Sequence, residues 1–238
     1  MKRTTYMMIG AYLAGILIIL GFVTWVVFTC VNVKGSDGSD DDLGGELVTT
    51  PLEKFDSVRF SDINLTFNDD HWAINGFKGI KISVNDSVDT PRIVAPSDWM
   101  PLVGYKVEDG CLNVSIDADK LAKKSDYKGF GVIGTDSYCP VEIVMPEGSL
   151  KGACLDNSCT LYIEGLTSQK LNLNSMGRIV LIKCDIDTVI APGDKNRFEE
   201  LKLDDSRIEF AEISAPSSFK LNPVNDSSYV EILQLRRR

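Results

Sequence analysis

Two patterns of hydrophobic positions divide this chain. From Met7 to Val31 the sequence is apolar and contains no charged residue. A helix of about 25 residues rises about 37 Å, which is enough to cross a hydrocarbon core about 30 Å thick. From residue 55 onward, apolar residues instead alternate with polar ones in short runs. The first pattern predicts one transmembrane helix at residues 7–31, and the second predicts β-strands.

The alternating runs are rich in Val, Ile, Leu and Phe, and turn-forming residues separate them. The runs are Val58/Phe60, Ile63/Leu65/Phe67, Ile80/Ile82/Val84, Leu112/Val114/Ile116 and Val141/Ile143/Met145. Asn85-Asp86, Asp109-Gly110 and Pro146-Glu147-Gly148 lie between them, and these residue types favour tight turns through positive φ or local side-chain hydrogen bonds. The sequence therefore predicts an all-β fold after the helix.

The C-terminal third contains a repeat of strand, Asn/Asp/Ser turn and strand. Residues 155–163 recur 18 residues later as residues 173–181. A third copy is predicted at residues 203–210, after a loop at residues 192–196, and a fourth copy at residues 221–232. A unit this small cannot bury its own apolar face, so its copies should stack. The pattern predicts a right-handed single-stranded β-helix, or β-solenoid, over residues 52–238. A β-sandwich of evenly spaced hairpins is the alternative.

Charges beside the apolar run predict its orientation. Lys2 and Arg3 precede it, and basic residues are retained on the cytoplasmic side. Residues 1–6 should therefore be a short cytoplasmic end, with the C-terminal domain periplasmic or otherwise extracytoplasmic. Residues 32–51 are rich in Gly, Ser and Asp and are predicted to form an acidic, flexible tether.

Cleavage of the N-terminal segment is the alternative to this single-pass topology. The apolar run is longer than that of a signal peptide, and no A-x-A-like site follows it. A lipoprotein acylated at Cys30 would need small residues before the cysteine, where the chain has Val27, Phe28 and Thr29. The sequence therefore favours an uncleaved anchor, with the lipoprotein at Cys30 as the alternative localisation.

Composition narrows the function classes. The net charge is −9, and all 34 acidic residues follow residue 34. Nucleic acid would be repelled by this acidic domain. The chain has six cysteines and one histidine but no C-x-x-C pair, so a zinc site of the usual spacing is not expected. Buried thiols that pack as small apolar residues are expected instead. We predict no cofactor and no metal.

Three groups of residues have side chains suited to catalysis or sugar binding, and the sequence assigns a catalytic role to none of them. His71 with Asp69 or Asp70 would be needed for a Ser-His-Asp arrangement, but the segment is typical of an exposed turn. Paired carboxylates could hydrolyse a glycosidic bond, and Trp72, Trp99 and Tyr105 could stack on a sugar, although such aromatics are more typical of a core or a rim. The carboxylate candidates are Glu199, Glu200, Asp204, Asp205 and Glu209.

Three motifs occur in a fixed order, and together they carry a family resemblance. They are Phe55-Asp56-Ser57-Val58, then Asp109-Gly110-Cys111-Leu112-Asn113-Val114, then Val141 to Pro146 directly before the repeats. This order resembles the auto-transporter adhesin head GIN domain family of Bacteroidetes-type bacteria, over about residues 52–235. The resemblance implies a right-handed β-solenoid on the cell envelope. The family's Ser-Gly-Ser-Gly turns are replaced here by Asp/Asn/Ser turns.

These observations predict a non-catalytic binding, adhesion or structural module, anchored in a membrane and exposed outside it. The alternative is a carbohydrate-processing enzyme that uses paired carboxylates on a β-helix face. The expected partners are the lipid bilayer, a glycan or envelope protein, and a second copy of the chain that associates through the ends of the solenoid.

Overall fold

The computed structural model describes residues 45–61, 65–66, 72–75, 79–117, 120, 131–134, 141–155, 160–175, 177–192, 198–216 and 218–237. The predicted cytoplasmic end, transmembrane helix and most of the tether, with Cys30, lie outside these ranges. Among the described residues, no helix has the length and apolar character needed to span a bilayer.

The described residues form an all-β structure with one short 3-10 helix, η1 (Met100–Leu102). This confirms the predicted class. The strands of the first half are β1 (Leu47–Pro51), β2 (Ser57–Phe60), β3 (Leu65–Thr66), β4 (Trp72–Asn75), β5 (Gly79–Val84), β6 (Arg92–Pro96), β7 (Val103–Glu108), β8 (Cys111–Ile116), β9 (Gly131–Gly134) and β10 (Glu142–Met145). Those of the second half are β11 (Gly152–Leu155), β12 (Thr160–Glu164), β13 (Thr167–Ser175), β14 (Arg178–Ile182), β15 (Asp185–Ala191), β16 (Glu200–Asp204), β17 (Arg207–Ala215), β18 (Lys220–Pro223) and β19 (Tyr229–Arg237).

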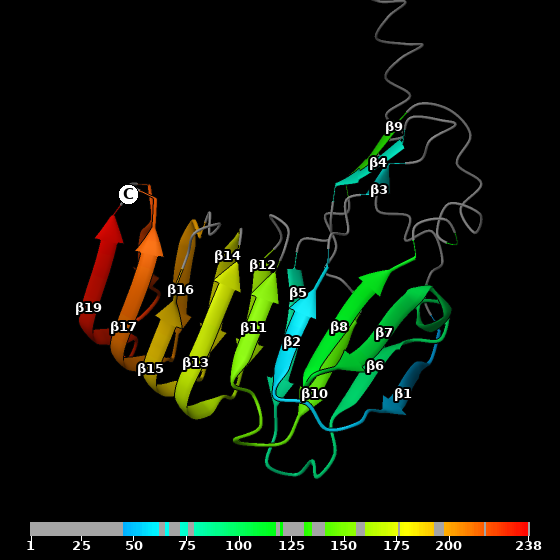
Figure 1. Ribbon diagram of the computed structural model, residues 1–238, viewed down its shortest axis with the longest axis horizontal. Coiled ribbons are helices and arrows are strands. Elements are labelled where there is room, and N and C mark those ends of the chain that lie inside the picture. The colour runs from blue at the N-terminus through cyan, green and yellow to red at the C-terminus, as the bar shows by residue number, and fades with distance from the viewer. Residues whose placement is uncertain are drawn as a thin grey trace, which may run out of the picture.

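Two mixed eight-stranded sheets lie face to face, as Figure 1 shows. Sheet A has the order β1-β6-β10-β5-β12-β14-β16-β18, and sheet B has the order β19-β17-β15-β13-β11-β2-β8-β7. A small third sheet, β3-β4-β9, is built from the excursions that follow β2 and β8, and it stands to one side of the stack.

From β11 onward the chain alternates between the sheets, and each strand pairs in parallel with the strand one circuit later. In sheet A, Thr160 lies beside Arg178, Arg178 beside Glu200, and Glu200 beside Lys220. In sheet B, β13, β15, β17 and β19 are parallel neighbours in the same way. Hairpins between successive strands, which the β-sandwich alternative requires, do not occur in this described part of the chain.

The predicted 18-residue register is right for one strand of the first pair of repeats and wrong for the rest. In sheet A Leu161 lies beside Ile179, as predicted, but in sheet B Leu155 lies beside Ser175 and not beside Leu173. Leu203, however, lies beside Leu181 in sheet A rather than over Leu173, which belongs to sheet B. The circuits after β14 are longer, and the Leu-x-Leu pattern occurs in both sheets, so the pattern alone assigned the third copy to the wrong strand.

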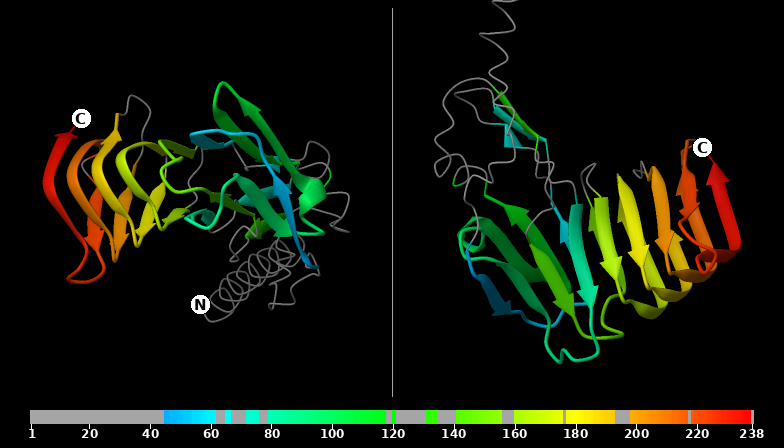
Figure 2. Two further views of the ribbon diagram at one scale, coloured as in Figure 1. Left: turned by 90° about the horizontal axis from the view of Figure 1, so that it is seen from below. Right: turned by 180° about the vertical axis from the view of Figure 1, so that it is seen from behind.

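The first circuit of the chain is inserted between later ones. β2 lies between β8 and β11 in sheet B, and β5 lies between β10 and β12 in sheet A, with all four contacts parallel. Beyond β8 and β10, the antiparallel strands β7, β6 and β1 complete that end of the stack (Figure 2).

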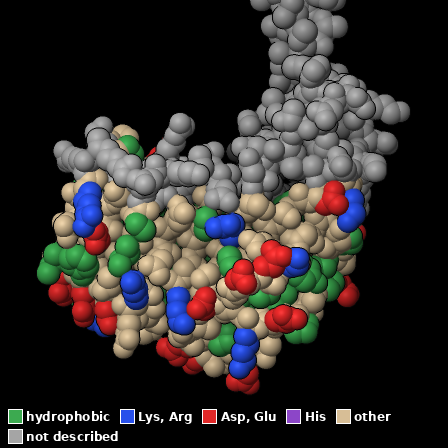
Figure 3. All heavy atoms as spheres, viewed as in Figure 1, with side chains coloured by type: hydrophobic (Ala, Val, Ile, Leu, Met, Phe, Trp, Pro, Cys, Tyr) green, Lys and Arg blue, Asp and Glu red, His purple; other side chains and the backbone are tan. Residues whose placement is uncertain are grey.

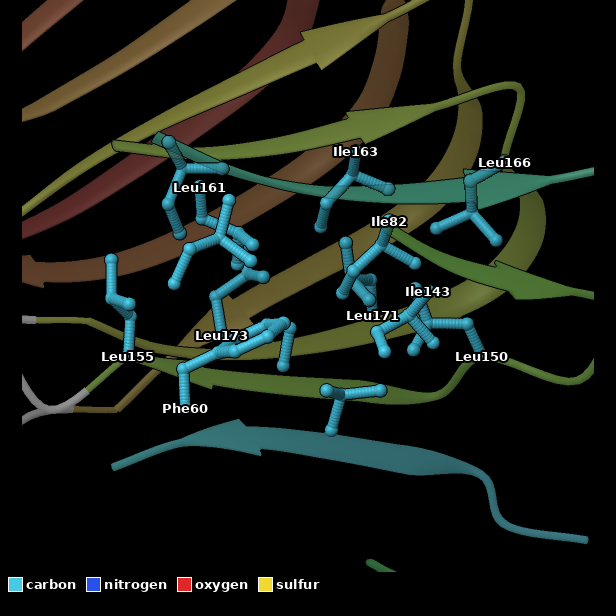
Figure 4. Close-up of a cluster of buried hydrophobic side chains, with 14 of the residues drawn as sticks. Phe60, Ile82, Ile143, Leu150, Leu155, Leu161, Ile163, Leu166, Leu171 and Leu173 are labelled. Carbon is cyan, nitrogen blue, oxygen red and sulfur yellow. The ribbon is translucent and has the colours of Figure 1, made fainter. Parts of the chain in front are cut away.

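One apolar core runs through the stack between the two sheets. The inward residues of four of the predicted alternating runs are buried, whereas the side chains of the Ile63/Leu65/Phe67 run lie outside what the structure describes. The labelled side chains in Figure 4 extend from both sheets into a shared layer. Fully buried members include Phe60, Ile82, Ile143, Leu161, Leu181, Ile186, Leu203 and Ile213. At about 25 cal/mol per Å² of buried apolar area, this continuous layer is the main source of stability.

Residues placed by the sequence in the tether belong partly to the folded domain. Leu47–Pro51 form β1, which pairs antiparallel with β6 along the edge of sheet A. The Gly/Ser/Asp composition that indicated a tether comes from residues before 47, whereas Leu-Val-Thr-Thr has strong β propensity.

Candidate functional site

The corner where β2, β8 and β11 begin is organised by Asp56. Its N–H donates to the carbonyl of Gly110 over 3.0 Å, and its own carbonyl accepts the N–H of Lys151 over 2.7 Å. Asp109 and Gly110 form the turn of the β7–β8 hairpin with φ of 50° and 77°, as the Asp-Gly pair predicts. Two of the three family-like motifs therefore meet here and hold three neighbouring strands in register.

The carboxylate of Asp56 forms an ion pair at this corner. The Nζ of Lys151 lies 3.1 Å from Asp56 Oδ2, and the Ser57 hydroxyl donates to Oδ1 over 3.0 Å. The hydrogen bond from Lys151 is the largest cause of a pKa of Asp56 below its ordinary value of 3.8, and partial burial opposes it. The charged form is thus favoured by the folded state.

Asp56→Asn is expected to make stability less dependent on acid pH. A carboxyl with a lowered folded pKa stabilises the fold above its unfolded pKa, and this contribution is lost as pH falls through the folded pKa. We expect the variant to be less stable at pH 7 by under about 1 kcal/mol, because the pair is half exposed, and equal to the parent near pH 2. Urea unfolding at both pH values measures this. Glu147→Gln, at an exposed turn position, is the matched control, and equal pH dependence in the two variants would contradict the assignment.

The outer face of sheet A carries charges that are paired between neighbouring strands. Lys81 on β5 lies 3.4 Å from Glu142 on β10 and 2.8 Å from Glu164 on β12. These carboxylates, Glu164 first, raise the pKa of Lys81. Arg178 on β14 lies 2.7 Å from Glu200 on β16. We call this face the charged wall, and its ion pairs tie successive circuits together.

A repeated turn joins sheet A to sheet B after β12, β14 and β16. Its first residue has positive φ, at Gly165 (74°), Lys183 (52°) and Asp205 (49°). The next residues along the stack form a buried ladder, in which Cys184 N–H donates to the Ser206 hydroxyl (2.9 Å) and Ser206 N–H donates to the Ser228 hydroxyl (3.4 Å). Neighbouring circuits are therefore joined at the turn as well as through the sheets.

Two of the described thiols, those of Cys111 and Cys184, lie in surroundings that favour their protonated form. Cys184 is buried, as the sequence predicted, and its thiol donates to the carbonyl of Ile163 over 3.4 Å. Burial raises the pKa of both Cys184 and the half-buried Cys111. Cys154 is also half-buried, whereas Cys139 and Cys159 lie outside the described residues.

Of the carboxylate candidates, the structure brings only Asp204 and Asp205 together. The Nδ2 of Asn225 lies 3.3 Å from Asp204 Oδ1 and 3.1 Å from Asp205 Oδ1, and the Ser227 hydroxyl also donates to Asp205. Glu200 is at the other end of β16, about 13 Å away along the strand, and is paired with Arg178.

Glu199 is exposed just before β16, and Glu209 is exposed on β17 in the other sheet. The five carboxylates therefore do not form a single cleft-facing set. Among the described residues, no group of three His, Cys, Asp or Glu side chains is placed to hold a metal ion.

The aromatic candidates do not form one platform. Trp99 is buried at 8% exposure beside η1, where it packs in the core, and Tyr105 is 40% exposed on β7. The side chain of Trp72 and all of His71, Asp69 and Asp70 lie outside what the structure describes. Trp99 is thus a core residue, which agrees with the expectation that aromatic side chains in a β protein lie in the core or at its rim.

Exposed hydrophobic side chains gather instead at the last circuit. We call this surface the open end: the β18 and β19 edges, with Val224, Tyr229, Ile232 and Leu235. These are four of the seven large hydrophobic side chains exposed among the described residues. Figure 3 shows hydrophobic side chains at this end, over β19, interspersed with charges.

The sequence analysis predicted contact through the ends of the stack but did not identify β19 or its exposed residues. A signal was present, because β19 carries apolar residues on both faces. Val230, Leu233 and Leu235 continue the inner rows, whereas Ile232 continues an outer row formed by Lys170, Thr188 and Phe210. An isoleucine at an exposed outer position of a terminal strand marks a surface for contact with another molecule.

Comparisons with known proteins identify only distant structural likenesses. No family model matches the chain, and no curated protein matches it. A "putative adhesin" from Parabacteroides distasonis has a similar structure at 14% identity, covering 81% of this chain and 79% of that one, with a TM-score of 0.41.

Two other solved structures are similar to the same extent. A "putative adhesin" from Bacteroides fragilis has 14% identity, 81% and 94% coverage and a TM-score of 0.37. A "putative lipid binding protein" from Parabacteroides distasonis has 11% identity, 82% and 78% coverage and a TM-score of 0.42. The function of this chain must therefore be argued from its own geometry.

Proposed function

We propose that this chain is a non-catalytic binding module of the cell envelope, a right-handed β-solenoid of the GIN domain type held at the outer side of a membrane by residues 7–31. In this proposal residues 1–6 are cytoplasmic and the folded domain is extracytoplasmic. The order of the Asp56, Asp109-Gly110 and Pro146 motifs supports the family assignment, and the parallel circuits support the solenoid.

The placement of the two ends carries the proposal. β1, which takes up the last residues of the predicted tether, is the edge strand of sheet A at one end, and the open end lies at the other. Eight strands at about 4.8 Å per spacing make the stack about 34 Å long. A chain anchored through residues before β1 would hold its exposed apolar end away from the lipid, where another molecule can reach it.

The side faces suit a rigid support. On the charged wall the ion pairs join one circuit to the next, and on sheet B Arg207 is paired with Asp185 across β17 and β15. The hydrogen bonds from Arg207 lower the pKa of Asp185. These charges already form ion pairs with neighbouring strands. A partner is therefore better placed to contact the open end, which has strand edges and exposed apolar side chains.

A topology measurement tests this function. The full chain is expressed in a Gram-negative host with one epitope at each terminus. We expect the protein to stay in the membrane fraction at alkaline pH with an intact mass that includes residues 1–31. Antibody should reach the C-terminal epitope in spheroplasts, and the N-terminal epitope only after lysis. A protein released by alkali, or the reverse accessibility, would contradict the proposal.

A further inference from the structure

We propose that the open end binds a second copy of this chain, through antiparallel pairing of β19 with β19 of its partner about a two-fold axis at Gln234. This inference rests on the proposed function, since it names the partner of the outward-facing end. The resulting rod has the two β1 strands at its far ends.

β19 is the strand that can pair, because the other edge at this end is blocked. β18 is four residues long and includes Pro223, which has no N–H to give to a new strand. β19 has nine residues without proline and pairs with β17 on one side. Its second side offers a row of backbone donors and acceptors of the kind that recruits another strand.

When two β19 strands pair antiparallel, compatible side chains lie opposite each other. From Ile232 to Arg236 the residues alternate outward and inward, with Leu233 and Leu235 beside the buried Ala211 and Ile213. Centring the pair on Gln234 places Leu233 opposite Leu235 of the partner, so the two cores join. Ile232, 59% exposed, then lies opposite Arg236, whose aliphatic stem can cover it.

Charge favours this antiparallel arrangement over a parallel one. Arg236 is held by Glu212 on β17 over 2.6 Å and stays on the outer face. In the antiparallel pair Arg236 comes opposite Ile232 of the second copy, so it faces no like charge. A parallel pair in register would place Arg236 beside Arg236 and Glu231 beside Glu231, and like charges directly opposite each other are destabilising. The pairing is isologous and closes at two copies.

Site-specific crosslinking of the full chain in mild detergent tests the geometry. Cβ atoms of directly opposed residues are about 4.5 to 5.5 Å apart, so Gln234→Cys should give a thiol-crosslinked dimer joined between the two copies of position 234. Ile232→Cys is the matched control, because its two copies would be about 13 Å apart along the strands. The linked peptides are identified by mass spectrometry, with the parent chain as background for the native thiols. Equal crosslinking at both positions, or none at position 234, would overturn the proposal.

Sedimentation over a concentration series gives an independent measure. Ile232→Lys is expected to weaken dimerisation about tenfold or more, equivalent to about 1.4 kcal/mol, because the lysine would lie directly opposite Arg236 of the second copy. Leu47→Lys, at a 71% exposed position of the opposite edge strand, should leave dimerisation unchanged. A parent chain that stays monomeric, or an equal loss with Leu47→Lys, would contradict the pairing. The epitope measurement of membrane topology does not depend on dimerisation. A monomer with the proposed topology would therefore refute the pairing of β19 and leave the proposed function standing.

Discussion

Replacing Phe60 by alanine is expected to lower the free energy of unfolding by about 3 to 5 kcal/mol. Phe60 is 1% exposed on β2, beside Leu155 on β11 and Val114 on β8. In Figure 4 its ring lies in the apolar layer near Leu155 and Leu173. Since β2 joins the first circuit of the chain to two later ones, a cavity at Phe60 weakens the contact between the halves of the stack. Urea unfolding of the full chain in detergent, followed by circular dichroism, measures the change.

Phe210→Ala provides the matched control. Phe210 is half-buried on the outer face of sheet B, in the row that contains Thr188 and Ile232. Removing the same ring there leaves a surface that water can fill, so we expect a loss of about 1 kcal/mol. If both variants lost the same amount, the core between the sheets would not be the principal source of stability.

The strands could be predicted from the sequence because their burial pattern has a period of two. Ile80, Ile82, Leu112 and Ile143 were all predicted to face inward, and all are buried. One face of each strand packs against the opposite sheet while the other meets water, and this alternation is written directly in the residue order. The turns at Asn85 and Asp109 were predictable for a local reason as well, since their side chains and backbone favour such geometry.

The pairing partners could not be predicted in the same way. Nothing in the alternation of Val58 and Phe60 indicates that β2 lies between β8 and β11, because period-two patterns define a face but not a neighbour. The same limit explains the wrong assignment of Leu203. The two strands of one circuit present similar apolar pairs to the same core, so the spacing of leucines does not show which sheet a strand joins.

The candidate site was predicted less well than the fold. The sequence indicated contact through the ends of a stack but did not show which end is exposed. At the first end, η1 and the antiparallel strands β6 and β7 bring Trp99 and Leu102 over the core. At the last circuit, the inward side chains of Leu221, Val230 and Leu233 are only partly buried. This difference in the cover of the core arises from long-range pairing and could be seen only in three dimensions.

Deleting one whole circuit, residues 185–206, is expected to leave a folded protein. The deletion joins Cys184 to Arg207, so β14 is followed by β17, and β17 takes the place of β15 beside β13. Arg207 then occupies the place of Asp185, and Ala211 that of Val189, because these residues are already neighbours in register. In a stacked array each circuit contacts only its neighbours, so removing one subtracts one set of interfaces. We expect a cooperative urea transition with the m-value lower by about a tenth, in proportion to the surface lost.

Deleting half of that circuit, residues 185–195, should instead abolish the cooperative transition. It removes β15 and leaves β14 and β16, both strands of sheet A, with no strand between them to return the chain through sheet B. The inner faces of β13 and β17 would then lose their shared neighbour, including the buried Ile186 and Val189. Equal loss of folding in both deletions would show that the circuits are not interchangeable units. A folded whole-circuit deletion that still dimerises would show that the open end acts independently of the length of the rod behind it.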